Sequence, residues 1–297
     1  MSDYNDDEIE ASRAPLLDHL VELRNRLIIC VAALFVGFGL CFAFADTLYV
    51  FLLRPFEVAA GLMAAQKASG GKHGPFDLFF ALLGLKDIPP LAPGALKLVF
   101  TAPLEFFFTK LKLAAFGAVA ICFPVLAFQL YRFVAPGLYK KERKAFLPFL
   151  LASPVLFMLG ATLVYYVMLP FVLWFSLSQQ IVGAGNISVE LLPKVSDYFT
   201  LVTSLLLAFG LCFQLPVVLS LAGLAGLVNA EMLRTGRRYA IVGVFVVAAI
   251  VTPPDPISQL MLAIPICLLY EISIWCVWLI ARNRRIEDEA GQDLVST

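Results

Sequence analysis

Charged residues are scarce in this chain of 297 residues: they make up 15% of it, against 61% for hydrophobic residues. A water-soluble domain could not cover its surface with so few charges. Runs of about 20 apolar residues are typical of helices that cross a membrane. Charge is absent altogether from residues 27–45, 113–131, 145–189, 198–230 and 239–254. The composition therefore excludes a soluble domain and predicts an integral membrane protein.

Recognisable catalytic and metal-binding patterns are also missing. Neither GxGxxG nor GxxxxGK followed by Ser or Thr occurs, so no nucleotide-binding loop is predicted. His19 and His73 are far apart in the sequence, and the six cysteines lie in apolar segments without CxxC spacing. We therefore expect no enzyme activity, no cofactor, no metal site and no nucleic-acid partner.

Six apolar segments are long enough to be considered as membrane spans. Because these runs are continuous rather than alternating, they favour helices over the strands of a barrel. The fold class that we predict is an all-α integral membrane protein with six transmembrane helices. Their approximate bounds are 27–45, 112–135, 146–176, 198–225, 239–252 and 257–280.

The last two of these helices are predicted to be short. Residues 239–252 would form a helix of about 21 Å at 1.5 Å per residue. The hydrocarbon layer is about 30 Å thick, and the sequence TPPDP that follows cannot extend the helix. The alternative is a tilted pair of helices with different bounds. Kinks that turn the spans into a curved wall are expected at Pro124, Pro154, Pro170, Pro216 and Pro265.

Three further segments lie outside the spans. Residues 1–14 and 286–297 are acidic and are predicted to be disordered, whereas residues 15–285 form the membrane domain. The stretch that begins at Pro15 has leucines at helical spacing, which predicts an amphipathic helix at the membrane surface. Residues 46–111 form a long loop with an apolar helical piece, and we expect this loop to cap the external face.

The basic residues indicate how the chain is oriented. An even number of spans places both termini on one side, and 14 of the 22 Lys and Arg residues lie there. Seven of the other eight lie in the loop 46–111, where charge has little effect on topology. Both termini are therefore predicted to be cytoplasmic.

Polar groups in or beside the spans are candidate functional residues. Glu142 is the one acid in the basic stretch YKKERK, and by composition alone it would balance charge on a solvated loop. Gln214 either bonds within the protein, to a neighbouring helix or to a carbonyl released by Pro216, or marks a docking site for another protein's helix. Glu271 is expected to bond to a neighbouring helix, since a proton relay usually has several such groups.

Four stretches together resemble the TatC family, the C subunit of twin-arginine translocases. They are PLLDHLVELRNRL, FVAPGLYKKER, FGLCFQLPV and VFVVAAIVTPPDPISQLMLAIPICLLYE, in the family's order across most of residues 15–280. The resemblance implies a receptor for signal peptides that have two consecutive arginines ahead of an apolar segment. It also implies single-span partners of the TatA and TatB types, a homo-oligomeric receptor complex, contact with membrane lipids, and the bacterial cytoplasmic (inner) membrane as the location.

The resemblance assigns roles to individual residues. The family's signal-binding carboxylates fall on Glu142 and Glu22. Neighbouring positions of the signal-binding region map onto Arg24, Phe133, Pro136 and Tyr139.

Two further family positions lie elsewhere in the chain. Many members have a glutamate in the fourth span where this chain has Gln214, which puts a charged role at that position in doubt but leaves hydrogen bonding. The acid of the external TPPD motif falls on Asp255, after Pro253 and Pro254.

These observations predict the core receptor subunit of a system that exports folded proteins with the proton motive force. The alternative is a proton-coupled secondary transporter of a small solute, which usually shows two related halves and charged groups near the midplane. We find neither pattern in the sequence. A purely structural scaffold is the third possibility, and copurification with a twin-arginine signal peptide separates all three.

Overall fold

The described part of the chain consists of long helices and one small β-hairpin. A computed structural model describes residues 3–69, 80–81, 83–85, 98–134, 143–184, 187–189, 192–251 and 256–295. The helices are α1 (Asp3–Ala43), α2 (Ala45–Ser69), α4 (Glu105–Val134), α5 (Arg143–Leu163), α6 (Leu169–Ser178), α7 (Val195–Cys212), α8 (Leu215–Leu224), α9 (Ala230–Val251) and α10 (Pro256–Val295). A π-helical segment, η2 (Val164–Met168), joins α5 to α6, and β1 (Ile181–Ala184) pairs antiparallel with β2 (Ile187–Val189).

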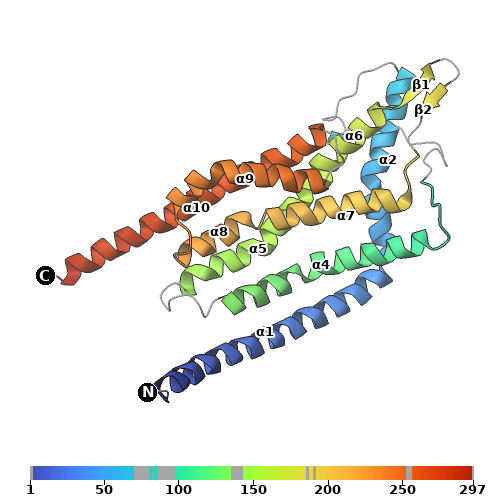
Figure 1. Cartoon of the computed structure of the whole chain (residues 1–297). Coiled ribbons are helices and arrows are strands. Elements are labelled where there is room, and N and C mark those ends of the chain that lie inside the picture. The colour runs from blue at the N-terminus through green and yellow to red at the C-terminus, as the bar shows by residue number, and fades with distance from the viewer. Residues whose placement is uncertain are drawn as a thin grey trace.

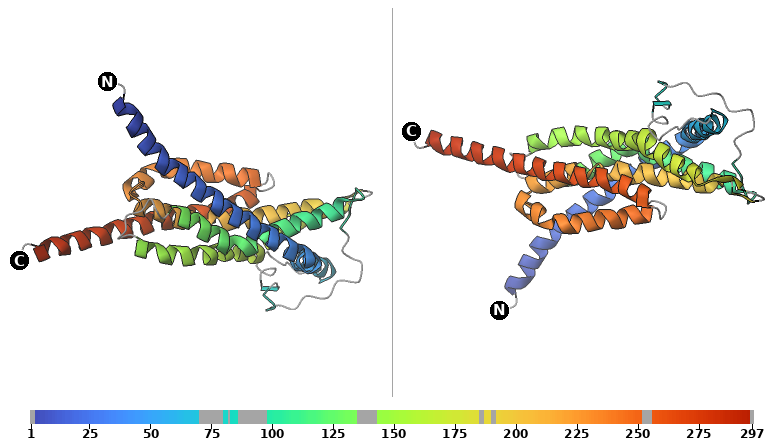
Figure 2. Two further views of the ribbon diagram at one scale, coloured as in Figure 1. Left: turned by 90° about the horizontal axis from the view of Figure 1, so that it is seen from below. Right: turned by 90° about the horizontal axis from the view of Figure 1, so that it is seen from above.

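The long helices lie in a row. Figure 1 shows α1 at one edge, then α4, and α9 with α10 at the other edge. α1 packs along α4, α4 along α7, and α7 along α5, while α10 packs against both α8 and α9. Along the helix axes the row has two ends. Both ends of the chain lie at one of them, and α2 with the hairpin lies at the opposite one (Figures 1 and 2). This placement agrees with the expected even number of spans.

The predicted number of membrane-crossing helices is confirmed, because six helical stretches in the described part of the chain are long and apolar enough. Five of them match predicted spans, and the sixth, Ala45–Ala64 in α2, is the apolar helical piece of the predicted external loop. The predicted span 239–252 lies in α9, which is not one of these six stretches. α9 does not meet the same criterion, since Arg234, Arg237 and Arg238 occupy its first half.

Both helices at the end of the chain are longer than the spans predicted for them. α9 has 22 residues and α10 has 40, because polar residues on one side of each apolar segment continue the same helix. The uninterrupted apolar part of α9, residues 239–251, still measures only about 20 Å at 1.5 Å per residue. The apolar part of α9 is therefore as short as predicted, whereas the whole helix is longer.

The acidic end segments differ from the prediction of disorder. Residues 3–14 continue α1, and residues 286–295 continue α10. Extending an existing helix needs no new nucleus, and Glu, Ala and Arg in these segments are good helix formers. For the same reason the predicted amphipathic surface helix is the first part of α1, in one piece with the first span.

Prolines divide two of the spans. The fourth span breaks at Phe213 and Gln214, and α8 starts again with Pro216 in its first turn. The third span passes through η2 directly before Pro170, which lies in the first turn of α6. A proline suits a first turn because the missing N–H has no partner there in any case. At Pro124 and Pro265, by contrast, the helices continue.

Two tyrosines bond to α2 at the point where a proline removes one of its backbone hydrogen bonds. Pro55 lies inside α2 and has no N–H to donate to the carbonyl of Phe51. The hydroxyl of Tyr165 donates to that carbonyl at 2.8 Å, and the hydroxyl of Tyr198 donates to the carbonyl of Leu52 at 2.7 Å. α2 is therefore fixed to both η2 and α7 at the end of the row away from the termini.

A carboxylate joins α4 and α7 at the same end. Glu105, the first residue of α4, accepts hydrogen bonds from Ser196 Oγ at 2.7 Å and from the Thr101 backbone N–H at 2.7 Å. Beside it, Val99 and Lys194 form an isolated parallel β-bridge. Negative charge at the first turn of a helix is favourable. The carboxylate of Glu105 lies at the start of α4 and also bonds to Ser196 in the first turn of α7.

Candidate functional site

The loop that carries the main predicted signal-binding residue connects α4 to α5. Glu142, Pro136 and Tyr139 lie outside the described residues. α4 ends at Val134 and α5 begins at Arg143, so the loop starts and ends at the end of the row that holds the termini.

Glu22, the second predicted carboxylate, lies on α1 beside the end of α4. The Nε and Nη2 atoms of Arg26 both donate to Glu22 Oε1, the first of them at 3.1 Å. Arg26 Nη1 also donates to Gln129 Oε1 on α4, at 3.4 Å. Since Gln129 is five residues ahead of the end of α4, the structure brings Glu22 close to the start of the loop with Glu142.

Two other predicted residues lie in the same region. Arg24 is exposed, and its Nη2 donates to the side chain of Asn25 at 3.4 Å. Phe133 is half-buried in the last turn of α4. Arg132, next to it, lies over the ring of Phe128 at 5.9 Å from the ring centroid. This end of the row therefore presents both cationic groups and an aromatic surface beside Glu22.

Gln214 bonds to a neighbouring helix, which was one of the alternatives for this residue. Its Nε2 donates to the backbone carbonyl of Ser153 at 2.9 Å, and Ser153 Oγ donates to Gln214 Oε1 at 2.6 Å. Both residues are buried, and the two bonds fix α5 to the break between α7 and α8. Pro216, also buried, follows in the first turn of α8. The amide therefore stabilises the bend of the fourth span from within the protein.

Glu271 has a partner on the adjacent helix, as expected. Arg237 Nη2 on α9 donates to Glu271 Oε2 on α10 at 2.7 Å, and both side chains are somewhat under half exposed. Next to this pair, the hydroxyl of Tyr270 donates to the carbonyl of Leu233 at 2.9 Å. Together these contacts join α9 to α10 in the part of α9 that carries arginines.

An apolar groove lies beside the break in the fourth span. It has a volume of about 390 Å³ and is formed by residues of α7, α8, α9 and α10. Gly243 on α9 leaves the groove open, since a Cβ added there would meet no atom within 4 Å. The outward residues of the same helix, Val242, Val246 and Ile250, are exposed. This edge of the row thus offers an apolar face next to Gln214.

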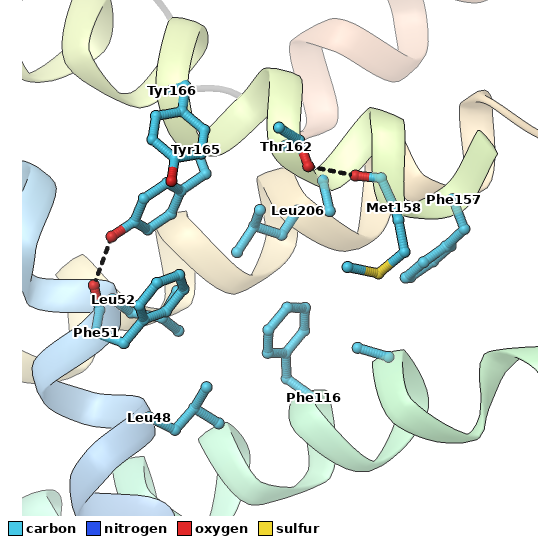
Figure 3. Close-up of a pocket in the computed structure, with 12 residues that line it drawn as sticks. Leu48, Phe51, Leu52, Phe116, Phe157, Met158, Thr162, Tyr165, Tyr166 and Leu206 are labelled. Atoms are coloured by element: carbon cyan, nitrogen blue, oxygen red, sulfur yellow. Dashed lines mark hydrogen bonds between the residues drawn. The ribbon is translucent and has the colours of Figure 1, made fainter. Parts of the chain in front are cut away.

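A second apolar cavity lies between α2, α4 and the segment α5–η2 (Figure 3). It has a volume of about 260 Å³, and its lining includes Phe51, Phe116, Met158 and Tyr165. Nothing in the sequence predicted this cavity, because its lining residues are spread along the sequence from Leu48 to Leu206.

The remaining predicted residues lie outside the described part of the chain. They are the residues of the TPPD motif between α9 and α10, namely Pro253, Pro254 and Asp255. Among the residues that are described, no group of three or more His, Cys, Asp or Glu side chains is arranged to hold a metal ion.

Sequence reasoning missed two polar contacts. Ser153 is one of several hydroxyl residues in the third span, directly before Pro154, and only its partner Gln214 shows what it does. Glu105 ends the sequence TAPLE, in which Thr, Pro and an acid are typical of a helix start, and this signal was available. Its second partner, Ser196, is 91 residues away and could not be read from the same pattern.

Comparison with known proteins gives consistent matches along most of the chain. The family model for the Sec-independent protein translocase protein (TatC) matches residues 18–265. The protein of that name from Magnetococcus marinus is 42% identical over 281 residues, which are 95% of this chain and 90% of that protein. The one from Aquifex aeolicus is 35% identical over 274 residues, covering 91% of this chain and 98% of that protein.

A solved structure is similar as well. The crystal structure of a twin arginine translocase receptor, TatC, superposes with a TM-score of 0.66 at 34% sequence identity. The match covers 87% of this chain and 97% of that chain.

Proposed function

The chain belongs to the TatC family of Sec-independent protein translocases, and on that premise we propose that it binds twin-arginine signal peptides at the cytoplasmic face. The family is named for a translocase and its receptor rather than for an enzyme. The observation that supports the proposal most directly is the position of Glu22 beside the end of α4, from which the loop with Glu142 departs.

The chemistry of the proposed site follows from its charges. A guanidinium group is planar and pairs best with a carboxylate through two parallel hydrogen bonds. Glu142 and Glu22 would supply the acceptors, and Phe133 an apolar contact for the segment that follows the arginines. The basic neighbours of Glu142 repel an arginine pair that does not reach the carboxylate, which favours one binding position.

Glu22 already accepts two hydrogen bonds from Arg26, which constrains its proposed role. An incoming arginine has to share the carboxylate with Arg26 or replace it. We infer that Glu22 adds to binding, whereas Glu142 provides the main contact. Arg24 lies exposed on the same turn of α1.

The receptor function predicts selective capture of signal peptides. The purified full-length protein in nanodiscs should retain a peptide with two consecutive arginines ahead of an apolar segment. The same peptide with two lysines should bind about tenfold more weakly, since lysine cannot form the bidentate pair. Fluorescence anisotropy with labelled peptides measures both affinities. Equal affinities for the two peptides would contradict the proposed recognition.

We also propose that single-span partners of the TatA and TatB types dock along α9. The groove beside Gly243 and the exposed valines of α9 offer close apolar packing, which drives helix association in lipid. Gln214 does not contact the partner directly in this proposal, because its amide oxygen and nitrogen both already bond to Ser153; it fixes the break between α7 and α8 beside the groove. The short apolar part of α9 would thin the bilayer there, which helps a folded cargo to cross.

A photocrosslinking experiment tests the docking model. A photoreactive amino acid at position 246 or 247 on α9 should crosslink to the membrane helix of a coexpressed TatA-type or TatB-type partner. The same probe at position 36, on the exposed face of α1 at the opposite edge of the row, is the control. Equal crosslinking from both edges, or none from α9, would count against docking on α9.

The proposed orientation places both termini in the cytoplasm of a bacterial cell, with the protein in the cytoplasmic membrane. The excess of Lys and Arg on that side supports it. Export would draw on the proton motive force, and several copies of the chain would form the receptor complex. The TPPD motif with Asp255 would then lie on the external side, and Glu271 would serve to join α9 and α10.

A further inference from the structure

The cavity between α2, α4 and α5–η2 is lined almost wholly by hydrocarbon. Two of its three hydroxyl groups are already engaged: Thr162 Oγ1 donates to the carbonyl of Met158 at 2.7 Å, and the Tyr165 hydroxyl donates to the carbonyl of Phe51 at 2.8 Å (Figure 3). A polar ligand would find few hydrogen-bond partners inside. The interior therefore suits an apolar chain.

The cavity opens toward the membrane and not only toward the protein. Phe51 on α2 and Met158 on α5 both line it, and they are 50% and 57% exposed. Val155 and Leu159 on the same face of α5 are exposed as well. A hydrocarbon chain can thus enter from the surrounding lipid.

The cavity lies in the half of the row that is farther from the termini, next to charged residues of α2. Tyr165 is 16 residues after the start of the third span, Phe149–Ser178, and 13 residues before its end, so the cavity itself lies at the depth of acyl chains. Asp46 on α2 pairs with Lys110, and Arg54 on α2 is exposed; charged side chains of this kind indicate that a membrane boundary is near. A lipid bound here would place its headgroup near that boundary and an acyl chain at the depth of the cavity.

A cationic side chain lies at this boundary. Arg54 is exposed on α2, one helical turn beyond Phe51, and its guanidinium is within electrostatic range of the Tyr165 hydroxyl. Among the described residues Arg54 forms no ion pair. Guanidinium groups bind phosphate oxygens through bidentate hydrogen bonds.

We propose that this cavity holds one acyl chain of an anionic glycerophospholipid, whose phosphate binds Arg54. The chemistry of the cavity favours a lipid over a partner helix, because its lining is almost wholly hydrocarbon and the exposed guanidinium of Arg54 lies one helical turn beyond Phe51. The bound lipid would fill the space under α2 and stabilise the attachment of α2 to the row.

A photoactivatable lipid tests the proposal. Phosphatidylglycerol with a diazirine in one acyl chain is added at trace amount to nanodiscs that contain the full-length protein. After irradiation, mass spectrometry should find the label on Phe51, Met158 or Thr162 above the level on exposed residues elsewhere. Excess unlabelled phosphatidylglycerol should remove this signal, whereas diacylglycerol with the same chains should not.

Two variants address the two halves of the site. Arg54→Gln should lower labelling at the cavity about tenfold through loss of a charge-assisted contact, and Lys194→Gln, at an exposed cation of the same side, should leave it unchanged. Ala161→Leu fills the cavity and should abolish labelling, while Ala115→Leu, on the exposed face of α4, should not.

The outcomes separate the proposal from its alternatives. Labelling that is no higher at the cavity than at other exposed residues would overturn it. Labelling that survives Arg54→Gln, or that diacylglycerol removes equally well, would refute the phosphate contact. Because Arg54 is exposed, its variant should fold normally, and the unfolding midpoint of each variant identifies any loss that comes from misfolding.

Discussion

Glu142→Gln should reduce export of twin-arginine cargo to background while the protein stays in the membrane. The substitution keeps the size of the side chain but removes the negative charge. A hydrogen bond to a charged group contributes about 1.5–3 kcal/mol, so losing the bidentate pair weakens binding by one to two orders of magnitude or more. The basic residues on either side of position 142 then face the arginine pair without a compensating charge, which adds repulsion.

The export assay should follow a folded reporter with a twin-arginine signal in cells that produce the variant as their only copy. Glu231→Gln, an exposed glutamate in the first turn of α9, is the matched control and should export normally. Glu22→Gln should have an intermediate effect, because Arg26 already occupies that carboxylate. Normal export by the Glu142 variant at wild-type protein levels would refute the assigned role.

Much of the fold could be predicted because membrane spans follow from composition. Long apolar runs have few alternatives in lipid, where every backbone polar group has to be satisfied within the segment. The same rule does not tell whether a run crosses the membrane: Ala45–Ala64 in α2, predicted as part of an external loop, is long and apolar enough to cross, whereas α9, predicted as a span, has too short an apolar part to meet the same criterion. Helix ends were less predictable, since polar residues extend α1, α9 and α10 well beyond their apolar parts.

The candidate site was predictable in its residue types but not in its pairings. A lone amide or acid within an apolar run signals a need for a partner, and this identified Gln214 and Glu271. The partners themselves, Ser153 and Arg237, lie 61 and 34 residues away in the sequence. Such contacts depend on how helices cross, and a single sequence does not specify helix crossings.

One such crossing, between α5 and α7, leads to the second large expected effect. Gly160→Leu should strongly destabilise the protein, because a Cβ at position 160 would lie 2.9 Å from the backbone oxygen of Phe209 and 3.0 Å from the ring of Phe213. A backbone atom cannot rotate away as a side chain can, so α5 and α7 would have to separate. The Ser153–Gln214 bonds lie further along the same pair of segments and would be broken by that separation.

Overpacking of this kind costs about 3 kcal/mol or more, which corresponds to a fall of roughly 6–12 °C in the unfolding midpoint. Gly39→Leu on α1 is the matched control, since a Cβ there would meet no atom within 4 Å and the position is exposed. It should leave the midpoint unchanged or raise it slightly, because glycine inside a helix is itself unfavourable. Differential scanning calorimetry of both variants in detergent measures the difference. Similar midpoints for the two would show that α5 and α7 do not need close contact at Gly160, and the tight crossing would lose its role in holding Gln214 in place.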